Sequence, residues 1–124
     1  MNRGLRNTAL ALLVTALLGI MASRVYALSV GYNTSSTIWK ATAYNTTTVD
    51  KTLYTNTRPA VGTGGVIVII TLLDNTEIAS KLFPYYTGVS DLTAAIPSHE
   101  YRKIYVGPNM PGQNVQGDLH YGTY

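Results

Sequence analysis

A run of nine residues at positions 65–73 (GVIVIITLL) constrains the fold of this chain more than any other feature. Five consecutive residues of the run, starting at Val66, are β-branched, which restricts χ1 and favours an extended strand over a helix. Nearly every residue is apolar, so the run lacks the alternation of a strand that has one face in water. It therefore predicts a central strand with both faces covered, and we expect Ile67, Ile69 and Leu72 in the core.

Residues 1–27 have the pattern of a secretory signal peptide. Arg3 and Arg6 precede an apolar stretch of about 14 residues, and small or tolerated residues occupy the positions before a cleavage site after Ala27. The stretch is shorter than the roughly 20 residues of a membrane-spanning helix, so we favour a cleaved leader over a retained membrane anchor. We expect residues 28–124 to form a single secreted β-sandwich domain.

Removal of the leader changes the charge of the chain. The leader holds three of the nine basic residues and none of the six acidic ones, so the secreted part has six of each and is formally neutral. A neutral domain has no basic surface for nucleic acid or an anionic membrane, and its weak charge repulsion favours self-association. The chain contains no cysteine, which excludes disulfides, a lipid anchor on cysteine and thiolate metal sites.

Short alternating segments, rich in Thr, Asn and Tyr and separated by turn residues, predict an all-β fold. Asp74 and Asn75 are expected to form a two-residue type I′ turn. One helical turn is expected at residues 92–95, after a cap at Ser90 or Asp91. We predict an antiparallel β-sandwich of jelly-roll or immunoglobulin type, with a small β-barrel as the alternative. Its strands, about seven in number, are expected at residues 28–32, 37–44, 51–54, 65–73, 76–83, 100–106 and 115–121.

No residue pattern points to catalysis or to a bound cofactor. The glycine-rich residues 62–65 precede a strand, whereas a phosphate-binding loop precedes a helix. Asp118 and His120 lie two residues apart and share one face of a predicted strand. His99 and Glu100 could add ligands, but the spacing matches no zinc motif, so we interpret the pair as the solvated face of an edge strand. No G-x-S-x-G nucleophile elbow occurs, and we predict no enzyme, no metal and no cofactor.

Candidate contact residues lie in the N-terminal strand, in loops and near the C-terminus. Tyrosine and methionine suit such contacts because the one is rigid and amphipathic and the other adaptable. Asn33 and Asn45 match the N-x-S/T pattern and are candidate glycosylation sites. The interface candidates are Leu28, Val30, Tyr32, Tyr85, Tyr86, Met110, Tyr121 and Tyr124.

These features favour a secreted, non-enzymatic structural subunit that assembles with copies of itself at a cell surface, as a filament subunit does. The strand at residues 28–32 is tethered at one end only and is a candidate for exchange between copies, although we slightly favour the alternative that it forms the first strand of its own sheet. A head-to-tail contact of this kind does not close and propagates into a fibre. The alternative is a small secreted binding or antibacterial, bacteriocin-like protein that acts at a cell envelope or on a glycan. No motif in the chain identifies a family.

Overall fold

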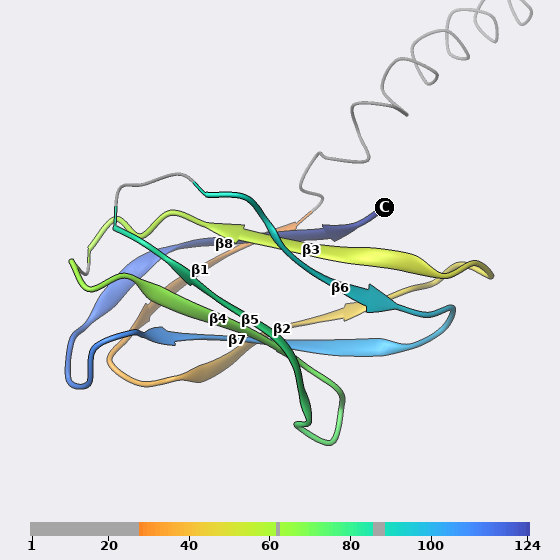
Figure 1. Cartoon of the computed structure of the whole chain (residues 1–124), viewed down its shortest axis with the longest axis horizontal. Coiled ribbons are helices and arrows are strands. Elements are labelled where there is room, and N and C mark those ends of the chain that lie inside the picture. The colour runs from red at the N-terminus through yellow and green to blue at the C-terminus, as the bar shows by residue number, and fades with distance from the viewer. Residues whose placement is uncertain (1–27, 62, 86–88) are drawn as a thin grey trace, which may run out of the picture.

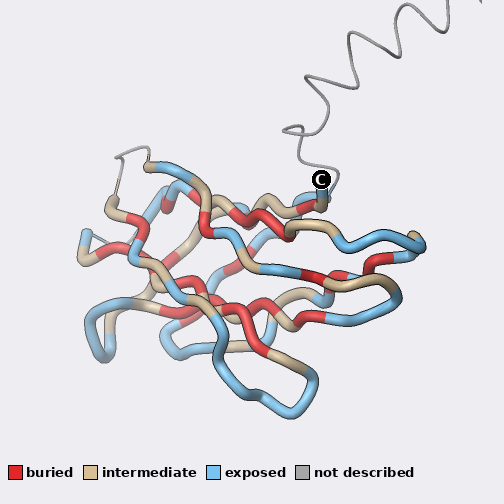
Figure 2. The backbone as a smooth tube through the Cα atoms, turned by 45° about the vertical axis from the view of Figure 1, so that its right-hand side comes forward, coloured by how far each residue is buried: buried red, intermediate tan, exposed pale blue. Residues whose placement is uncertain are grey.

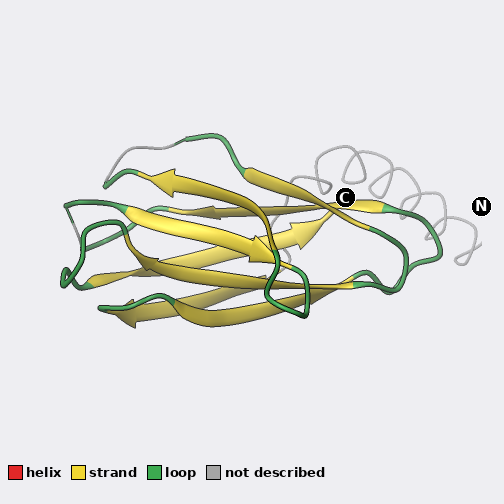
Figure 3. Ribbon diagram, turned by 60° about the horizontal axis from the view of Figure 1, so that its bottom comes forward, coloured by secondary structure: helices red, strands yellow, loops and turns green. Residues whose placement is uncertain are grey.

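The computed structural model describes residues 28–61, 63–85 and 89–124. The predicted leader, Gly62 and Tyr86 lie outside the described residues. The described chain forms two antiparallel sheets of four strands each, which pack face to face as a β-sandwich (Figures 1 and 3). The strands are β1 (Leu28–Thr34), β2 (Ile38–Tyr44), β3 (Lys51–Thr57), β4 (Val66–Thr71), β5 (Glu77–Phe83), β6 (Leu92–Ile96), β7 (Tyr101–Pro108) and β8 (Val115–Thr123).

The strand order is that of a jelly roll. Sheet A has the order β1-β8-β3-β6, and sheet B has the order β2-β7-β4-β5. The first strand pairs with the last, the second with the seventh, the third with the sixth and the fourth with the fifth, as in one long hairpin wrapped into two sheets. Two further pairings, β3 with β8 and β4 with β7, complete the sheets. The predicted antiparallel sandwich is confirmed, with eight described strands rather than about seven.

The core lies between the two sheets and is built from alternate residues of their facing strands (Figure 2). Burying one large aliphatic or aromatic side chain of this kind stabilises the fold by about 1.5–3 kcal/mol. Most of these side chains are β-branched or aliphatic, as suits the pleated surface of a strand. The fully buried members are Leu53, Val66, Val68, Ile70, Phe83, Ile96, Ile104, Val106, Val115 and Leu119.

Strand β4 occupies the predicted position, but its core residues are the alternate set. Every second residue from Val66 to Ile70 points into the core, while Ile67 and Ile69 are half-buried on the opposite face. Leu72 follows the end of the strand and is also half-buried. The prediction that Ile67, Ile69 and Leu72 are core residues is therefore wrong. Both sets of alternate residues are apolar, so the sequence pattern could not decide which one faces inward.

Residues 92–96 form strand β6 and not the predicted helical turn. Leu92 and Ile96 point into the core, and the whole segment pairs with β3. The Asp91 carboxylate, which was predicted to cap a helix, instead accepts a hydrogen bond from Asn56 Nδ2 at 2.8 Å. Pairing with a distant strand thus outweighs the helix preference of the alanines in this segment.

The connection between β4 and β5 spans five residues, 72–76, and does not contain the predicted two-residue type I′ turn. The Asn75 N–H donates to the Leu72 carbonyl at 3.0 Å, and the Leu72 N–H donates to the Thr76 carbonyl at 2.9 Å. A type I′ turn needs positive φ at both central residues, but Asn75 has a φ of 71° and Asp74 is not in this region. The loop is a type I turn followed by a left-handed residue, and it places Asn75 beside sheet B.

Candidate functional site

The two outer faces of the sandwich differ in chemistry. Strand alternation and register decide which side chains point away from the core. On sheet A these residues are mainly polar and include Ser29, Asn33, Thr52, Asn56, Thr93, Gln116, Asp118 and His120. On sheet B they are mainly aromatic or aliphatic; we call this set the apolar face, and it comprises Trp39, Tyr44, Ile67, Ile69, Ile78, Leu82, Tyr101 and Tyr105.

Several side chains of the apolar face are strongly exposed. Trp39 is 57% exposed, Tyr101 44% and Leu82 41%. A single exposed apolar residue is common on a soluble protein, but a contiguous patch on one sheet marks an interaction surface. The apolar face is therefore the principal candidate for the working surface of this protein.

A cation lies over the indole of the apolar face. Lys103 Nζ lies 4.6 Å from the centroid of the Trp39 ring and donates a hydrogen bond to Asn75 Oδ1 at 2.7 Å. The Tyr105 hydroxyl donates to the same oxygen at 2.6 Å. The Trp39 indole N–H donates to the Ala41 carbonyl at 3.1 Å, so hydrogen bonds fix the indole as well as the lysine and the tyrosine. These contacts order the centre of the face before any partner arrives.

A shallow hollow of about 320 Å³ adjoins this cluster. Its floor is partly apolar, from Ile69, and its rim carries hydroxyl, amide and carboxylate groups. Such a combination can bind a small ring, such as that of a sugar, which has hydroxyl groups at its edge and an apolar face. The lining residues are Thr37, Ile69, Thr71, Asn75, Glu77 and Tyr105.

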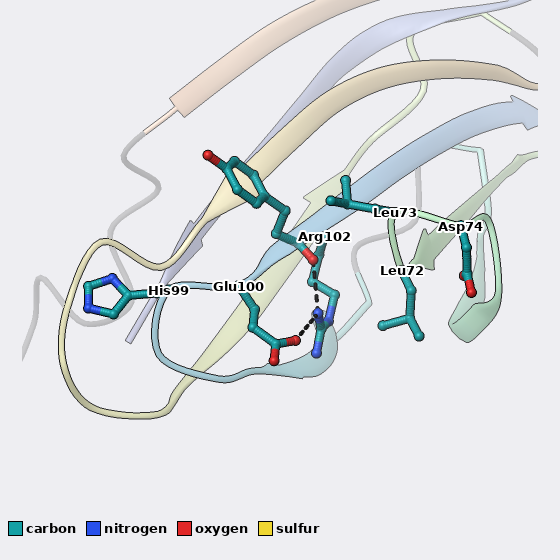
Figure 4. A pocket seen from close by; sticks show the side chains of 7 residues that line it. Leu72, Leu73, Asp74, His99, Glu100 and Arg102 are labelled. Carbon is teal, nitrogen blue, oxygen red and sulfur yellow. Dashed lines mark hydrogen bonds and ion pairs between the residues drawn. The ribbon is translucent and has the colours of Figure 1, made fainter.

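A second hollow, of about 390 Å³, lies at the end of sheet B where the β4–β5 and β6–β7 turns meet. Arg102 Nη1 lies 3.2 Å from a Glu100 carboxylate oxygen, and Glu100 points toward it, whereas His99 and Asp74 point away (Figure 4). Hydrogen bonds from Thr76 hold the pKa of Asp74 below its usual value. The carboxylates and the imidazole do not converge on one point, so this hollow offers no nucleophile and base within reach of each other.

An aromatic stack borders the second hollow. The Tyr44 and Tyr101 rings are stacked, with centroids 4.2 Å apart and an interplanar angle of 26°. The Tyr44 hydroxyl lies 3.3 Å from His99 Nδ1. Tyr101 belongs to both the hollow and the apolar face. In the register of sheet B the pair of Thr42 and Lys103 lies between this stack and the pair of Trp39 and Tyr105.

Asp118 and His120 lie on the outer face of sheet A, with Leu119 between them pointing into the core. Their strand, β8, is an inner strand between β1 and β3, so the interpretation of an edge strand is corrected. His99 and Glu100 lie in the β6–β7 turn, outside sheet A. Within the described ranges, no group of three or more His, Cys, Asp or Glu side chains could hold a metal ion.

The structure separates the predicted interface residues into two groups. Tyr32 is buried, with its hydroxyl 2.7 Å from Thr57 Oγ1, and Val30 and Tyr121 pack against the core. Tyr85 is half-buried, and Tyr86 is outside the described residues. The exposed members are Leu28, Met110 and Tyr124.

The two candidate glycosylation sites differ in access. Asn33 is exposed on β1, whereas the side chain of Asn45 is almost fully buried. Asn45 Nδ2 donates to the Val49 carbonyl at 2.7 Å and to the Ile96 carbonyl at 2.9 Å. A glycan on this nitrogen would remove at least one of these bonds, so the geometry favours Asn33 as an acceptor.

The open edges of the two sheets are protected to different degrees. Charged residues, prolines and bulges are the devices that keep edge strands from pairing with other chains. In sheet B, β2 carries a bulge next to Lys40, and β5 carries Glu77 and Lys81. In sheet A, β1 has an unbroken register and contains no charged residue and no proline, and β6 contains neither type of residue.

Sequence reasoning missed the apolar face. Its residues come from segments up to 66 positions apart in the chain, such as Trp39 on β2 and Tyr105 on β7, and only the strand order brings them together. The signal that could have found it was the run at residues 66–70, which is apolar on both faces. The outer side of that run forms part of the apolar face.

Comparison of the chain with protein-family models, with curated proteins and with solved structures found no match. Among the residues that the structure describes, no helix has the length and apolar character needed to cross a membrane.

Proposed function

We propose that this protein is a secreted, non-enzymatic structural subunit that assembles with copies of itself outside the cell. The observation that carries the proposal is the contrast between the two outer faces, one polar and one apolar. Covering a half-exposed side chain such as Trp39 or Leu82 would contribute on the order of 1 kcal/mol. Several such residues lie together, so association has a substantial driving force.

The charge of the chain supports the same proposal. With six basic and six acidic residues after removal of the leader, long-range repulsion between copies is weak. The undefended edges of sheet A add a second kind of contact, because an open strand edge is a template for pairing. A second copy of this chain is therefore the partner that these surfaces fit best.

Exchange of β1 between copies is one route to assembly. β1 is the first described strand and pairs with β8 alone, so it can leave its sheet without disturbing the chain order. Its departure would cost the burial of Tyr32 and the contact between Tyr32 and Thr57, and the incoming strand of a neighbour would have to restore both.

The test begins with the full chain, expressed with its own leader in a secreting host. The secreted protein is examined by sedimentation velocity and negative-stain electron microscopy over a range of concentrations. We expect ordered assemblies from the unmodified chain and a clear loss of assembly from Leu82→Lys, which places a charge on the apolar face. Gln116→Lys adds the same charge to the outer face of sheet A and is the matched control.

Monomers at every concentration would contradict the proposal. Equal assembly by Leu82→Lys and Gln116→Lys would contradict the role of the apolar face. Both variants must keep the far-ultraviolet circular dichroism spectrum of the unmodified chain, which separates lost assembly from lost fold.

A second candidate function is a small secreted binding protein, of antibacterial type or otherwise, that engages a glycan of a cell envelope. The favouring observation is the cluster of Trp39, Lys103, Tyr105 and Asn75 beside the hollow of about 320 Å³. Aromatic rings bordered by fixed hydrogen-bonding groups suit a sugar ring. Co-sedimentation with insoluble peptidoglycan tests this function, which predicts binding that Trp39→Ala abolishes while the fold is kept.

A further inference from the structure

We propose that copies of this chain join edge to edge through sheet A, with β1 of one copy paired to β6 of the next, so that sheet A continues from copy to copy. This inference rests on the proposed self-assembly and names the surface and the partner that would carry it. Among the described strands, β1 and β6 each have a single neighbour within sheet A, so each has one open edge. No strand has to leave its own sheet.

The strand directions suit this joint. All three pairings within sheet A are antiparallel. Because the sheet has four strands, β1 and β6 run in opposite directions. A second copy placed by translation therefore brings its β1 antiparallel to β6 of the first copy, and antiparallel ladders are the more stable kind. An odd number of strands would have produced a parallel joint instead.

The hydrogen-bond pattern identifies the backbone groups that point to each open edge. The backbones of Thr52 and Tyr124 exchange hydrogen bonds of 2.8 and 2.9 Å, which shows that these two residues form a hydrogen-bonded pair between β3 and β8. In an antiparallel ladder such pairs alternate, so the direction of every other backbone group in sheet A follows from the register. The residues whose N–H and C=O groups point to the open edges are Ser29, Gly31 and Asn33 on β1 and Thr93 and Ala95 on β6.

The side chains of β1 and β6 project in matching directions relative to their open backbone groups. On both strands the residues with open backbone groups project from the polar outer face, and the intervening residues, such as Val30 and Leu92, project toward the core. Pairing β1 with β6 thus places polar residues beside polar ones and apolar residues beside apolar ones. A shift of the pairing by one residue would place polar side chains beside apolar ones, so only registers that differ by two residues are compatible with the joint.

Among these registers of the β1–β6 joint, one is favoured by the residues that lie opposite each other. With Ser29 opposite Ala95, Gly31 lies opposite Thr93, and Leu28, which is 52% exposed, lies opposite the core residue Ile96. A shift by two residues in one direction would place Ser29 opposite Pro97, which has no N–H to donate. The register that pairs Ser29 with Ala95 therefore keeps proline out of the new ladder, and it also covers Leu28.

Charged side chains lie near both edges: Lys40 and Asp118 beside β1, and Arg102 and Lys81 beside β6. Arg102 Nε donates to the Ala95 carbonyl at 3.1 Å, which leaves the Ala95 N–H and a second lone pair on the oxygen. Lys40 lines a hollow with Gly31 on the outer side of β1. In the preferred register Asn33, which lines the same hollow as Lys40, lies opposite Asp91 of the next copy, so an opposite charge is brought to this part of the edge.

An engineered disulfide can report this joint because the chain has no cysteine of its own. Within one copy, β8 and β3 separate β1 from β6, so Ser29 and Ala95 are at least about 14 Å apart at the usual strand spacing. A disulfide needs Cα atoms within about 7 Å, and an intramolecular bond is excluded. Between copies, directly opposite residues of an antiparallel pair are about 5.5 Å apart.

The experiment compares two double variants of the full chain, each secreted with its own leader, purified under reduction and then oxidised. Ser29→Cys with Ala95→Cys should produce a ladder of covalent oligomers on a non-reducing gel, at least about tenfold more intense than that of the control. The control is Ser29→Cys with Ser80→Cys, because Ser80 is exposed on β5 in sheet B. A second experiment tests charges at the same two positions. The double variant Ser29→Lys with Ala95→Glu places opposite charges across the joint and should assemble. The double variant Ser29→Lys with Ala95→Lys places like charges directly opposite each other, which is unfavourable, and should not assemble.

Electron microscopy of the same samples separates the two levels of the proposal. Filaments together with a ladder specific to the first cysteine pair support both the assembly and the edge joint. Filaments with no ladder, with equal ladders from both pairs, or with equal assembly of the two charge variants would overturn the edge joint and leave self-assembly standing. Monomeric protein in every sample would overturn both.

Discussion

Truncation of Ile70 to alanine should destabilise the fold much more than the same truncation of its neighbour Ile69. Ile70 is fully buried between the sheets, whereas Ile69 is half-buried on the apolar face. Removing a buried isoleucine costs about 2–5 kcal/mol because it forfeits transfer energy and leaves a cavity. At Ile69 the cavity is open to solvent and about half the transfer energy is lost, so we expect about 1 kcal/mol. For a domain of this size, each kcal/mol lowers the midpoint of thermal unfolding by roughly 4–8 °C.

The difference is measured by urea unfolding, followed by far-ultraviolet circular dichroism at a concentration where sedimentation shows monomers. Circular dichroism is preferred because Trp39, the only tryptophan, is already exposed in the folded state. We expect the midpoint urea concentration to fall sharply for Ile70→Ala and only slightly for Ile69→Ala, with similar slopes. Equal midpoints, or the reverse order, would refute the assignment of the two faces of β4.

The secreted protein should begin at Leu28 when its mass is measured; a chain that still began at Met1 would contradict both the leader and the neutral charge. Asn45→Ala should lower the free energy of unfolding by about 2–4 kcal/mol, because one buried and one partly buried carbonyl lose their donor, whereas the exposed Asn33→Ala should cost less than about 1 kcal/mol. Similar losses for the two variants in chemical unfolding would refute the structural role of Asn45. Burial raises the pKa of Tyr32 in the folded state above that of the unfolded chain. The free energy of unfolding should therefore stay constant up to about pH 10 and fall above it, because the unfolded chain loses this proton more readily. The fall should be smaller in Tyr32→Phe. An identical pH profile for that variant would contradict the assignment. Deletion of residues 28–32 should unfold the domain by circular dichroism, because Tyr32 belongs to the core; a folded deletion variant that no longer assembles would instead support strand exchange.

Much of the fold was predictable from local pattern. Alternating segments and the β-branched run located most of the strands, and the spacing of the polar turns indicated an antiparallel sandwich. The jelly-roll order was not predictable, since it depends on which strands pair over long distances. Strand β6 shows this most clearly: its alanines favour a helix locally, and only pairing with β3 makes the segment extended.

The working surface was harder to predict than the fold. On β7 the alternation of Tyr101 and Tyr105 with Ile104 was visible, but each of the two alternate sets contains one basic residue, so the pattern did not indicate which one faces solvent. The same ambiguity reversed the assignment on β4. The usual rule that polar residues point outward cannot be applied to a sandwich in which one outer face is itself apolar. The residues for which the rule fails are those of the candidate interaction surface.

The most direct test of self-assembly through sheet A is the axial rise per subunit in cryo-electron microscopy images of the secreted protein. Four strands per copy, spaced by about 4.8 Å in the direction of their hydrogen bonds, give about 19 Å across the strands, and the preferred register adds a stagger of four residues, about 13 Å, along them. Together these displacements predict filaments with a rise of about 23 Å. Particles that remain monomeric at every concentration would contradict assembly itself. Filaments whose successive copies are instead displaced only along the strands would contradict the edge joint and point to contacts at the ends of the sandwich.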